Sequence, residues 1–476
     1  MKVLSIKQPS IKPAIALGIA LASLSIGSAV IEAQLLSGGS KAIAILPSST
    51  QSAIEKKLPA LASARQQAES LRPEAPIVLP TDVSTYFGAV AGGGAPSYNE
   101  IALEKNVLYF QRSLLQLNLN PVKAHLFFAN GNSGEATVRY LDENDQEQFK
   151  APDIPHLDGA ATQGNAKAWF EAIAQAPKKC PSFFYFTGHG AYNAENEDNN
   201  WMLLWQEAFV SVKEMASWLD KLPAREDAPF VTMMAQCYSG SFANLIYEQG
   251  DPRRPVALQT RCGFFATVAD RPSVGCTPAV NEADYKDYSS SFFAGLTGRD
   301  RTGNTVSSAD YNQDDKISYA EAHAFAKVDE ATTDWPISTV EAWLQRPLRN
   351  STKKGFLVQP MSSWIAIARP EQQYVIESLA EALNFNLSQS FLRNELSQNQ
   401  PPADTVEEAY RKRLEMELLN VAAEAQLRQE GDFNKIKTLD RLIKCEAGFW
   451  KTDSTQSDRT QTDSTPAETN ENEKLI

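Results

Sequence analysis

Short apolar segments alternate with segments of helical periodicity between residues 86 and 268. The apolar segments predict five strands, at residues 86–91, 124–129, 181–186, 229–235 and 263–268. Helical spacing predicts helices over residues 101–115, 166–176 and 212–222, the first of them preceded by an S-x-x-E capping box at Ser97 and Glu100. This alternation indicates βαβ units, and nearly continuous apolar strands are typical of a sheet covered on both faces. The sequence therefore predicts the α/β class with a mostly parallel sheet.

The pattern changes toward the end of the chain. Residues 81–345 are assigned to the α/β domain, and residues 346–450 to a C-terminal α-helical region. Beyond Pro370 the strand signals become rare, and the helical stretches 371–396 and 405–428 dominate. Residues 451–476 are rich in Thr, Ser, Asp and Glu, which predicts a disordered polar tail.

The N-terminus has the composition of an export signal. Lysines at positions 2, 7 and 12 precede an uncharged apolar stretch, residues 14–31, that ends in small residues. We interpret residues 1–33 as a cleaved signal peptide in preference to an uncleaved anchor, because 18 apolar residues are at the short limit of a membrane span. Residues 34–80 then form a linker or pro-segment. The protein is expected to be exported, periplasmic or extracellular, and to contact a membrane only if residues 14–31 stay attached.

Charge and cysteine content narrow the class of protein. The net charge of −13 and the lack of a basic stripe argue against nucleic acid as a partner. Five cysteines, an odd number, leave at least one free thiol or an intermolecular bridge in an exported protein. Cys262 and Cys276 are near enough in sequence to be a candidate disulfide.

Two reactive side chains follow predicted strands directly. His189 lies in a Gly-His-Gly turn after the third strand, and Cys237 follows the fourth strand in the sequence Gln-Cys-Tyr-Ser-Gly. Ligand chemistry in parallel sheets gathers at the carboxyl ends of the strands. An imidazole there can take the proton of a thiol and return it to a leaving amine, and backbone N–H groups near Gly190 and Cys237 can hold the oxyanion. The alternatives are a buried cysteine that acts as a small apolar residue and a structural histidine.

The two turns together resemble the caspase-like clan of cysteine peptidases. Thr187-Gly188-His189-Gly190 and Cys237-x-Ser239-Gly240 most resemble the legumain-like branch, peptidase family C13, and the histidine lies about 50 residues before the cysteine, as in caspases. The resemblance covers roughly residues 84–330. It implies a caspase-like three-layer sandwich, a thioester intermediate, and peptides or proteins as substrates, without an organic cofactor.

The resemblance also suggests where a substrate side chain binds. Residues 265–270 correspond to the strand end that lines the pocket for the residue before the scissile bond. Here the chain departs from the animal and plant enzymes, because the full basic and acidic set of their pocket is not found. Asp270 is the candidate substrate contact and would favour a basic residue.

Residues 310–321 follow the pattern of an EF-hand calcium loop. The expected ligands are Asp310, Asn312, Asp314, Lys316 through its carbonyl, Ser318 and Glu321. Asp315 occupies the position usually held by glycine, where a left-handed backbone is needed that Asp tolerates at modest cost. Two glycines interrupt the incoming helix, so a complete helix–loop–helix is not expected. The alternative is an acidic turn before a helix capped by Ser318 and Glu321.

These patterns favour a calcium-assisted, exported cysteine endopeptidase with Cys237 and His189 as its dyad. A rival interpretation is a catalytically inert caspase-like fold that serves as a calcium-stabilised binding module, with the C-terminal helices as its docking part. A third is a hydrolase that uses the same two residues on another amide or ester.

Overall fold

The structure is a computed structural model in which residues 73, 75–224, 227–398 and 404–450 are described. All of them belong to one compact unit, Ile43–Ile476. The expectations for residues 1–33, for most of 34–80 and for 451–476 lie outside the described residues. Within the described part of the chain, no helix has both the length and the apolar character needed to cross a membrane.

The centre of the fold is a six-stranded sheet with the order β11-β10-β9-β5-β1-β2. Its strands are β1 (Tyr86–Gly92), β2 (His125–Phe128), β5 (Ser182–Gly188), β9 (Phe230–Ala235), β10 (Arg261–Phe265) and β11 (Ile337–Ser338). Only the edge strand β11 runs antiparallel to its neighbour, β10. The five predicted strands and the mostly parallel sheet are therefore confirmed, whereas β11 is too short to give a sequence signal.

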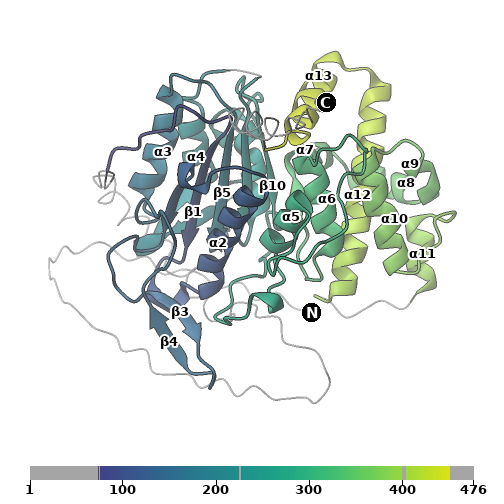
Figure 1. Cartoon of the computed structure of the whole chain (residues 1–476). Coiled ribbons are helices and arrows are strands. Elements are labelled where there is room, and N and C mark those ends of the chain that lie inside the picture. Colours follow the sequence, from purple (N-terminus) through teal and green to yellow (C-terminus); the bar gives the residue numbers. More distant parts are fainter. Residues whose placement is uncertain (1–72, 74, 225–226, 399–403, 451–476) are drawn as a thin grey trace, which may run out of the picture. The chain divides into compact units, whose positions relative to one another are not determined.

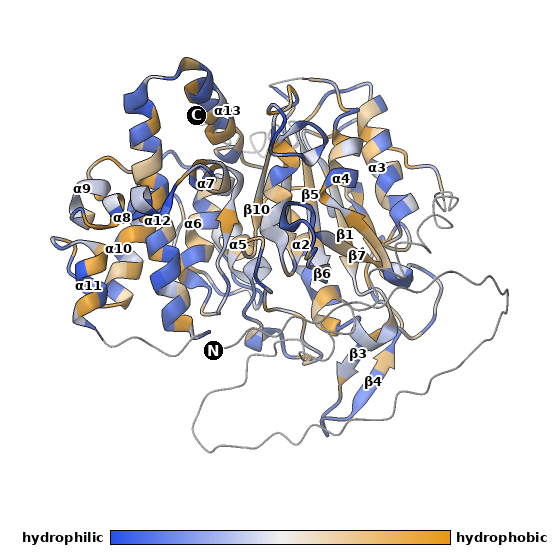
Figure 2. Ribbon diagram, turned by 180° about the vertical axis from the view of Figure 1, so that it is seen from behind, coloured by the Kyte–Doolittle hydropathy of each residue, from blue (hydrophilic) through white to orange (hydrophobic). Residues whose placement is uncertain are grey.

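Helices cover both faces of this sheet (Figure 1). One face packs against α2 (Ile101–Gln116), α5 (Tyr288–Thr297) and α6 (Tyr319–Asp329), and the other packs against α3 (Gln163–Gln175) and α4 (Val212–Leu219). Alternate residues of β1 serve the two cores, with Phe87 and Ala89 on the α2 side and Tyr86 and Val90 on the α3 side. The hydrophobic colouring in Figure 2 accordingly gathers on the central strands. The structure is thus α/β, with helices on both sides of its sheet.

Two small sheets interrupt the main alternation. They are the hairpin of β3 (Val138–Leu141) with β4 (Glu147–Lys150), and the three-stranded sheet of β6 (Gly190–Ala191), β7 (Trp201–Leu204) and β8 (Ala208–Ser211). The second lies directly beyond β5, so it frames the turn that carries His189. Neither was predicted, because strands of two to four residues carry too little periodicity.

The remaining helices lie toward the end of the chain, and all but the first of them, α7, belong to the predicted C-terminal helical region of residues 346–450. They are α7 (Thr339–Gln345), α8 (Asn350–Leu357), α9 (Met361–Ile365), α10 (Pro370–Ala382), α11 (Phe391–Ser397), α12 (Val406–Glu430) and α13 (Phe433–Glu446). The stretch expected to be one helix over residues 371–396 is divided between α10 and α11. Met361, Leu379 and Leu418 belong to one core that also includes Ala324 of α6, so the region packs onto the α/β part.

A disulfide joins Cys262 of β10 to Cys445 of α13. The expected pairing of Cys262 with Cys276 is therefore wrong. Cys262 and Cys445 lie in the same buried core on the α2 side of the sheet, whereas Cys276 lies in the irregular segment after β10 and is free. Closeness in sequence did not indicate closeness in space.

Candidate active site

His189 and Cys237 leave neighbouring strands at the same edge of the sheet. β5 and β9 are adjacent and parallel, and Thr187 pairs with Ala235, so each reactive residue lies two positions beyond a paired residue. His189 is one of the groups whose charge lowers the pKa of Cys237. The structure therefore places the two predicted residues in the turns that follow adjacent parallel strands.

Gly190 brings the two turns into direct contact. A Cβ atom added to Gly190 would lie 2.0 Å from the carbonyl oxygen of Cys237 and 2.8 Å from the Gln236 side chain. Real Cβ atoms do not approach a backbone oxygen so closely, and a backbone oxygen cannot move aside as the end of a flexible side chain can. The glycine after the histidine is therefore required for the approach of the two strand tips.

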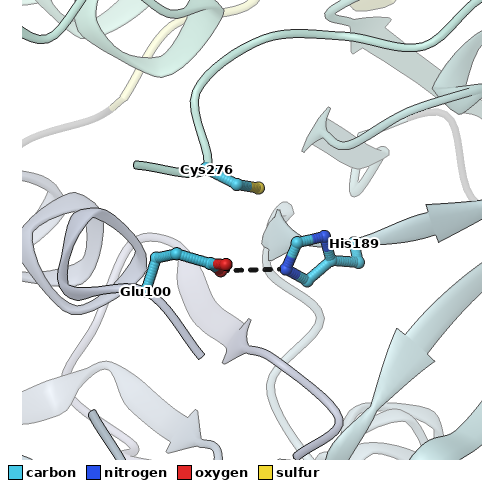
Figure 3. Close-up of side chains that lie close together, drawn as sticks. All are labelled: Glu100, His189 and Cys276. Atoms are coloured by element: carbon cyan, nitrogen blue, oxygen red, sulfur yellow. Dashed lines mark hydrogen bonds and ion pairs between the residues drawn. The ribbon is translucent and has the colours of Figure 1, made fainter. Parts of the chain in front are cut away.

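The imidazole of His189 is fixed from one side. Its Nε2 lies 2.9 Å from the carbonyl oxygen of Tyr98 and 3.0 Å from Oε2 of Glu100. Both partners are acceptors, so Nε2 carries a hydrogen and Nδ1 has the lone pair in the neutral ring. Nδ1 is buried and has no hydrogen-bond partner among the described residues. The basic nitrogen is thus the one turned away from the carboxylate (Figure 3).

Glu100 was expected to belong to a capping box with Ser97, and that expectation is wrong. Residues 96–98 form a short 3₁₀ turn, and Glu100 itself is the N-cap of α2, without a side-chain cap. Its carboxylate instead binds His189 and, at 2.8 Å, the guanidinium of Arg139. The sequence did not indicate the contact of Glu100 with His189, because both partners of its carboxylate lie far away in the sequence.

Charge in the site is set by this buried carboxylate. Burial alone would raise the pKa of Glu100, but His189 and Arg139 hold it below its usual range. Burial alone would lower the pKa of His189, but Cys276 and Glu100 raise it well above its usual value. Cys276 and Glu100 together therefore favour the protonated form of the ring, against the effect of burial.

The thiol of Cys237 is covered in this conformation. Cys237 is 5% exposed, and its sulfur accepts a hydrogen bond from the Ser273 backbone N–H at 3.3 Å. Burial and the neighbouring Cys276 raise the pKa of Cys237 to about 11, although His189 and the Ser273 N–H lower it. At rest the sulfur is therefore a protonated thiol beneath the segment that contains Ser273.

The segment of Ser273 and Val274, which covers Cys237, is held in place by the loop between α6 and β11. The Val274 N–H donates to the Asp334 carboxylate at 3.0 Å, and Asp334 lies in the loop between α6 and β11. Arg413 of α12 donates to the carbonyl oxygens of Lys327, Glu330, Thr332 and Asp334. The C-terminal helical region thus positions the loop that holds the cover of Cys237.

The turn after Cys237 does not begin an α-helix. Tyr238 has a left-handed backbone with φ of 60°, and Ser239–Ile246 is a 3₁₀ helix. Cys237 therefore does not open an α-helix, and the dipole of such a helix does not act on its sulfur. The turn is held to the next strand end, because the Tyr238 N–H donates to the Arg271 carbonyl at 2.8 Å.

Asp270 is beside this turn but is not part of the dyad. It precedes Arg271 in the chain, and its side chain is exposed. Residues 265–270 lie next to the turn of Cys237, because the Ser239 hydroxyl hydrogen-bonds to the backbone of Thr267. The role of Asp270 in substrate binding stays a prediction.

Cys276 is a second site residue, besides Glu100, whose role the sequence did not indicate. Ligand atoms of Glu100, His189 and Cys276 all lie within 4.8 Å of one another, although the three residues come from distant parts of the sequence. Figure 3 shows the sulfur facing the imidazole ring from across the site. Cys276 follows an irregular segment with no periodicity, so the odd number of cysteines was its only signal.

The candidate calcium loop is well ordered by its own backbone. The carboxylate of Asp310 accepts from the N–H groups of Asp314 and Asp315, and the side chains of Asn312 and Asp314 accept from Asp314 and Lys316. Asp315 has φ of 62°, the left-handed conformation expected at the glycine position. The incoming helix ends at Thr297, so a complete helix–loop–helix is absent from the described residues, as expected.

Glu321 was interpreted either as a calcium ligand or as a helix-capping residue, and its two carboxylate oxygens have different partners in this loop. Ser318 and Glu321 form the capping box of α6, and the other oxygen of Glu321 accepts from the N–H groups of Tyr311 and Asn312. The carboxylate therefore closes the loop onto its beginning. An all-oxygen set of this kind fits Ca²⁺, and Lys316 would add its carbonyl.

Comparison of the sequence with models of known protein families and with curated proteins finds no match.

Proposed function

We propose that this chain is a cysteine endopeptidase of the caspase-like clan, in its legumain-like branch, that acts through Cys237 and His189. The observation that supports this most is the placement of the two residues at equal distances beyond paired positions of adjacent parallel strands, with Gly190 against the Cys237 carbonyl. Helices on both faces of a mostly parallel sheet support the finer assignment to a caspase-like three-layer sandwich.

In the proposed reaction, the His189 ring first releases its Nδ1 proton to water, and the neutral Nδ1 then takes the proton of the Cys237 thiol. The sulfur attacks the peptide carbonyl carbon, and backbone N–H groups near Gly190 and Cys237 stabilise the oxyanion. The imidazolium then gives its proton to the leaving amine, which breaks the C–N bond and leaves a thioester. His189 next activates a water molecule that hydrolyses the thioester and restores the thiol. Glu100 and the Tyr98 carbonyl hold the ring through Nε2 during both halves.

Substrate entry requires the cover of Cys237 to move. Ser273 touches the sulfur, and the residues around it are irregular rather than part of a helix or strand. A peptide would displace this segment and occupy the edge formed by residues 265–270, where Asp270 would favour a basic residue. The covered thiol represents a latent form in this proposal.

Calcium bound at the start of α6 would assist catalysis indirectly, because the loop after the end of this helix holds the segment that covers Cys237. The loop of residues 310–321 begins this helix, and the loop after the helix carries Asp334, whose carboxylate holds Val274 above the thiol. Bound Ca²⁺ would fix the start of α6 through Asp310, Asn312, Asp314, Lys316, Ser318 and Glu321. Export of the protein, to the periplasm or the exterior, is supported by the Cys262–Cys445 disulfide, because such bonds persist in oxidising compartments.

The rival function is an inert, calcium-stabilised binding module. It is favoured by one specific observation: the sulfur of Cys237 is nearly inaccessible and its pKa is raised to about 11. A thiol in that state is a poor nucleophile.

Turnover of a mixed peptide library by the purified full chain separates the two functions. We expect hydrolysis in the presence of calcium that falls at least about 100-fold in Cys237→Ala and in His189→Ala, since acid–base catalysis contributes about 10²–10⁴. Cys180→Ala is the matched control, because Cys180 is also a buried cysteine outside the disulfide but lies in the core on the α3 side of the sheet. No turnover by the wild type, or equal turnover by Cys237→Ala, would contradict the proposal.

A further inference from the structure

Cys276 lies on a short stretch of chain that is fixed on both sides. Before it, the Val274 N–H donates to the Asp334 carboxylate at 3.0 Å. After it, the Thr277 carbonyl accepts from the Ala102 N–H at 3.3 Å. Cys276 itself is partly exposed, whereas the other two cysteines outside the disulfide are buried. Its sulfur is therefore held beside the site by its neighbours and is the most accessible of the three.

The sulfur of Cys276 faces the imidazole ring of His189 (Figure 3). One sulfur, one nitrogen and one oxygen atom of Cys276, His189 and Glu100 lie within 4.8 Å of one another. Glu100 holds the ring through Nε2, and Nδ1 has no hydrogen-bond partner among the described residues. A thiol, an imidazole and a carboxylate are the groups by which cysteine enzymes activate a nucleophile. Cys276 thus has the surroundings of a reactive thiol.

Charge distinguishes this sulfur from that of Cys237. In the covered form, in which Ser273 lies over Cys237, burial raises the pKa of Cys237 to about 11. Burial opposes the protonated ring of His189, but Cys276 and Glu100 favour it. An imidazolium beside a cysteine favours the thiolate, which is the reactive form of the side chain. The covered form therefore presents Cys276, in preference to Cys237, as its nucleophile.

We propose that Cys276 is a site of thiol–disulfide exchange, activated by His189 and Glu100, that reacts with small disulfides. Its sulfur attacks one sulfur of a disulfide RSSR, which forms the mixed disulfide on Cys276 and breaks the original S–S bond. The leaving RS⁻ takes the proton from His189 and departs as RSH. Small disulfides belong to the oxidising compartments in which a bond such as Cys262–Cys445 persists.

Resting on the proposed peptidase function, this exchange activates Cys237. The reaction leaves the His189 ring neutral, so that its Nδ1 lone pair is available for the Cys237 proton. It also attaches a group to Cys276 beside Glu100 and His189, which are each 1% exposed, so the chain from Ser273 to Cys276 must shift. Ser273 then no longer covers the sulfur of Cys237.

The test is the reaction of the native full chain with dipyridyl disulfide, whose released thione absorbs light, followed by mass spectrometry to locate the modified cysteine. We expect a fast phase of one equivalent that modifies Cys276 ahead of Cys237. Because only a few per cent of an ordinary thiol is thiolate at neutral pH, His189→Ala and Glu100→Gln should slow this phase about tenfold. Cys276→Ser should abolish it, and the matched control Cys180→Ala should leave it unchanged.

A second measurement tests the link to Cys237. After one equivalent of reagent, the chain should hydrolyse peptides about tenfold faster or more, and reduction should restore the original rate. Turnover that is unchanged or lost would show that Cys276 does not activate Cys237. Modification of Cys237 ahead of Cys276, or an equally fast phase in His189→Ala, would overturn the exchange site. If neither form turns over peptide while exchange at Cys276 depends on His189, the exchange site stands and the peptidase function fails.

Discussion

At the scale of single residues, Glu100 directs its carboxylate away from the helix it begins and toward His189. This contact holds the ring through Nε2, leaves Nδ1 on the side away from the carboxylate, and together with Cys276 favours the protonated ring. Glu100→Gln keeps the shape but removes the charge, so we expect kcat for peptide hydrolysis to fall about tenfold or more with little change in KM. Glu147→Gln is the matched control, because Glu147 is the exposed second partner of Arg139. Equal losses in both variants would show that Glu100 acts only through Arg139.

Position 190 has no room for a side chain larger than that of glycine. Gly190→Ala places a methyl group against the Cys237 carbonyl, so the two strand tips must separate. We expect peptide hydrolysis to fall at least about 100-fold, and overpacking to lower the free energy of unfolding by about 1–3 kcal/mol. Gly355→Ala in α8 has open space around it and should leave hydrolysis unchanged. Chemical denaturation and initial rates measure the two effects, and a fully active Gly190→Ala would contradict this picture of the site.

Cys237 and His189 could be predicted because a reactive side chain in a small-residue turn after an apolar strand is a local pattern. Glu100 and Cys276 could not, since their importance depends on contacts that join positions far apart in the sequence. The same reason explains the wrong pairing of Cys262 with Cys276: the true partner, Cys445, is 183 residues away.

At the scale of elements, the loop of residues 310–321 contains the candidate calcium ligands and also the residues that cap α6. Asp314→Asn keeps the side-chain oxygen that accepts from the Lys316 N–H but removes a charge from the candidate calcium ligands. We expect Ca²⁺ to raise the thermal midpoint of the wild type, because a ligand at 100 times its Kd stabilises by about 2.7 kcal/mol, and to raise it much less in Asp314→Asn. The measurement is thermal unfolding with and without Ca²⁺.

Asp432→Asn is the control for this effect, since Asp432 caps α13 through similar backbone hydrogen bonds outside the loop. It should respond to calcium as the wild type does. An unchanged midpoint of the wild type at millimolar Ca²⁺ would leave only the helix-cap interpretation of Glu321.

Long apolar strands and long helices were predictable, because their periodicity extends over enough residues. The strands β6, β7, β8 and β11 were not, although the first three frame His189 and the last completes the sheet edge. Short strands are formed by their pairing partners, and those partners are known only from the tertiary structure.

At the scale of the whole molecule, α13 connects the helical region to the end of the sheet. The Glu446 carboxylate accepts from the Val340 N–H and the Ser338 hydroxyl, and the adjacent Cys445 forms the disulfide with β10. Burial raises the pKa of Glu446 to about 8. The folded state therefore binds this proton more tightly than the unfolded state does, so the stabilisation is complete below about pH 4.5 and is lost as pH rises through about 8.

Glu446→Gln is neutral at every pH. Its amide oxygen can accept from the Val340 N–H, and its NH₂ group can donate to the Ser338 hydroxyl oxygen in place of the original hydrogen bond. We expect it to be more stable than the wild type by a few kcal/mol at pH 9, with the difference shrinking toward pH 5, since one pKa unit corresponds to about 1.4 kcal/mol. Denaturant unfolding across this pH range measures the difference. Exposed Glu143→Gln in the β3–β4 turn should follow the wild type. A constant difference between Glu446→Gln and the wild type would show that Glu446 is not protonated in the fold.

The most direct measurement of the central proposal is the alkylation rate of Cys237, followed by mass spectrometry of its peptide, with and without Ca²⁺. If His189 activates this sulfur, Cys237 will react faster than an ordinary cysteine in a peptide at neutral pH, and His189→Ala will remove that advantage. If Cys237 reacts no faster than an ordinary thiol and is indifferent to His189, the two strand tips do not form a catalytic dyad.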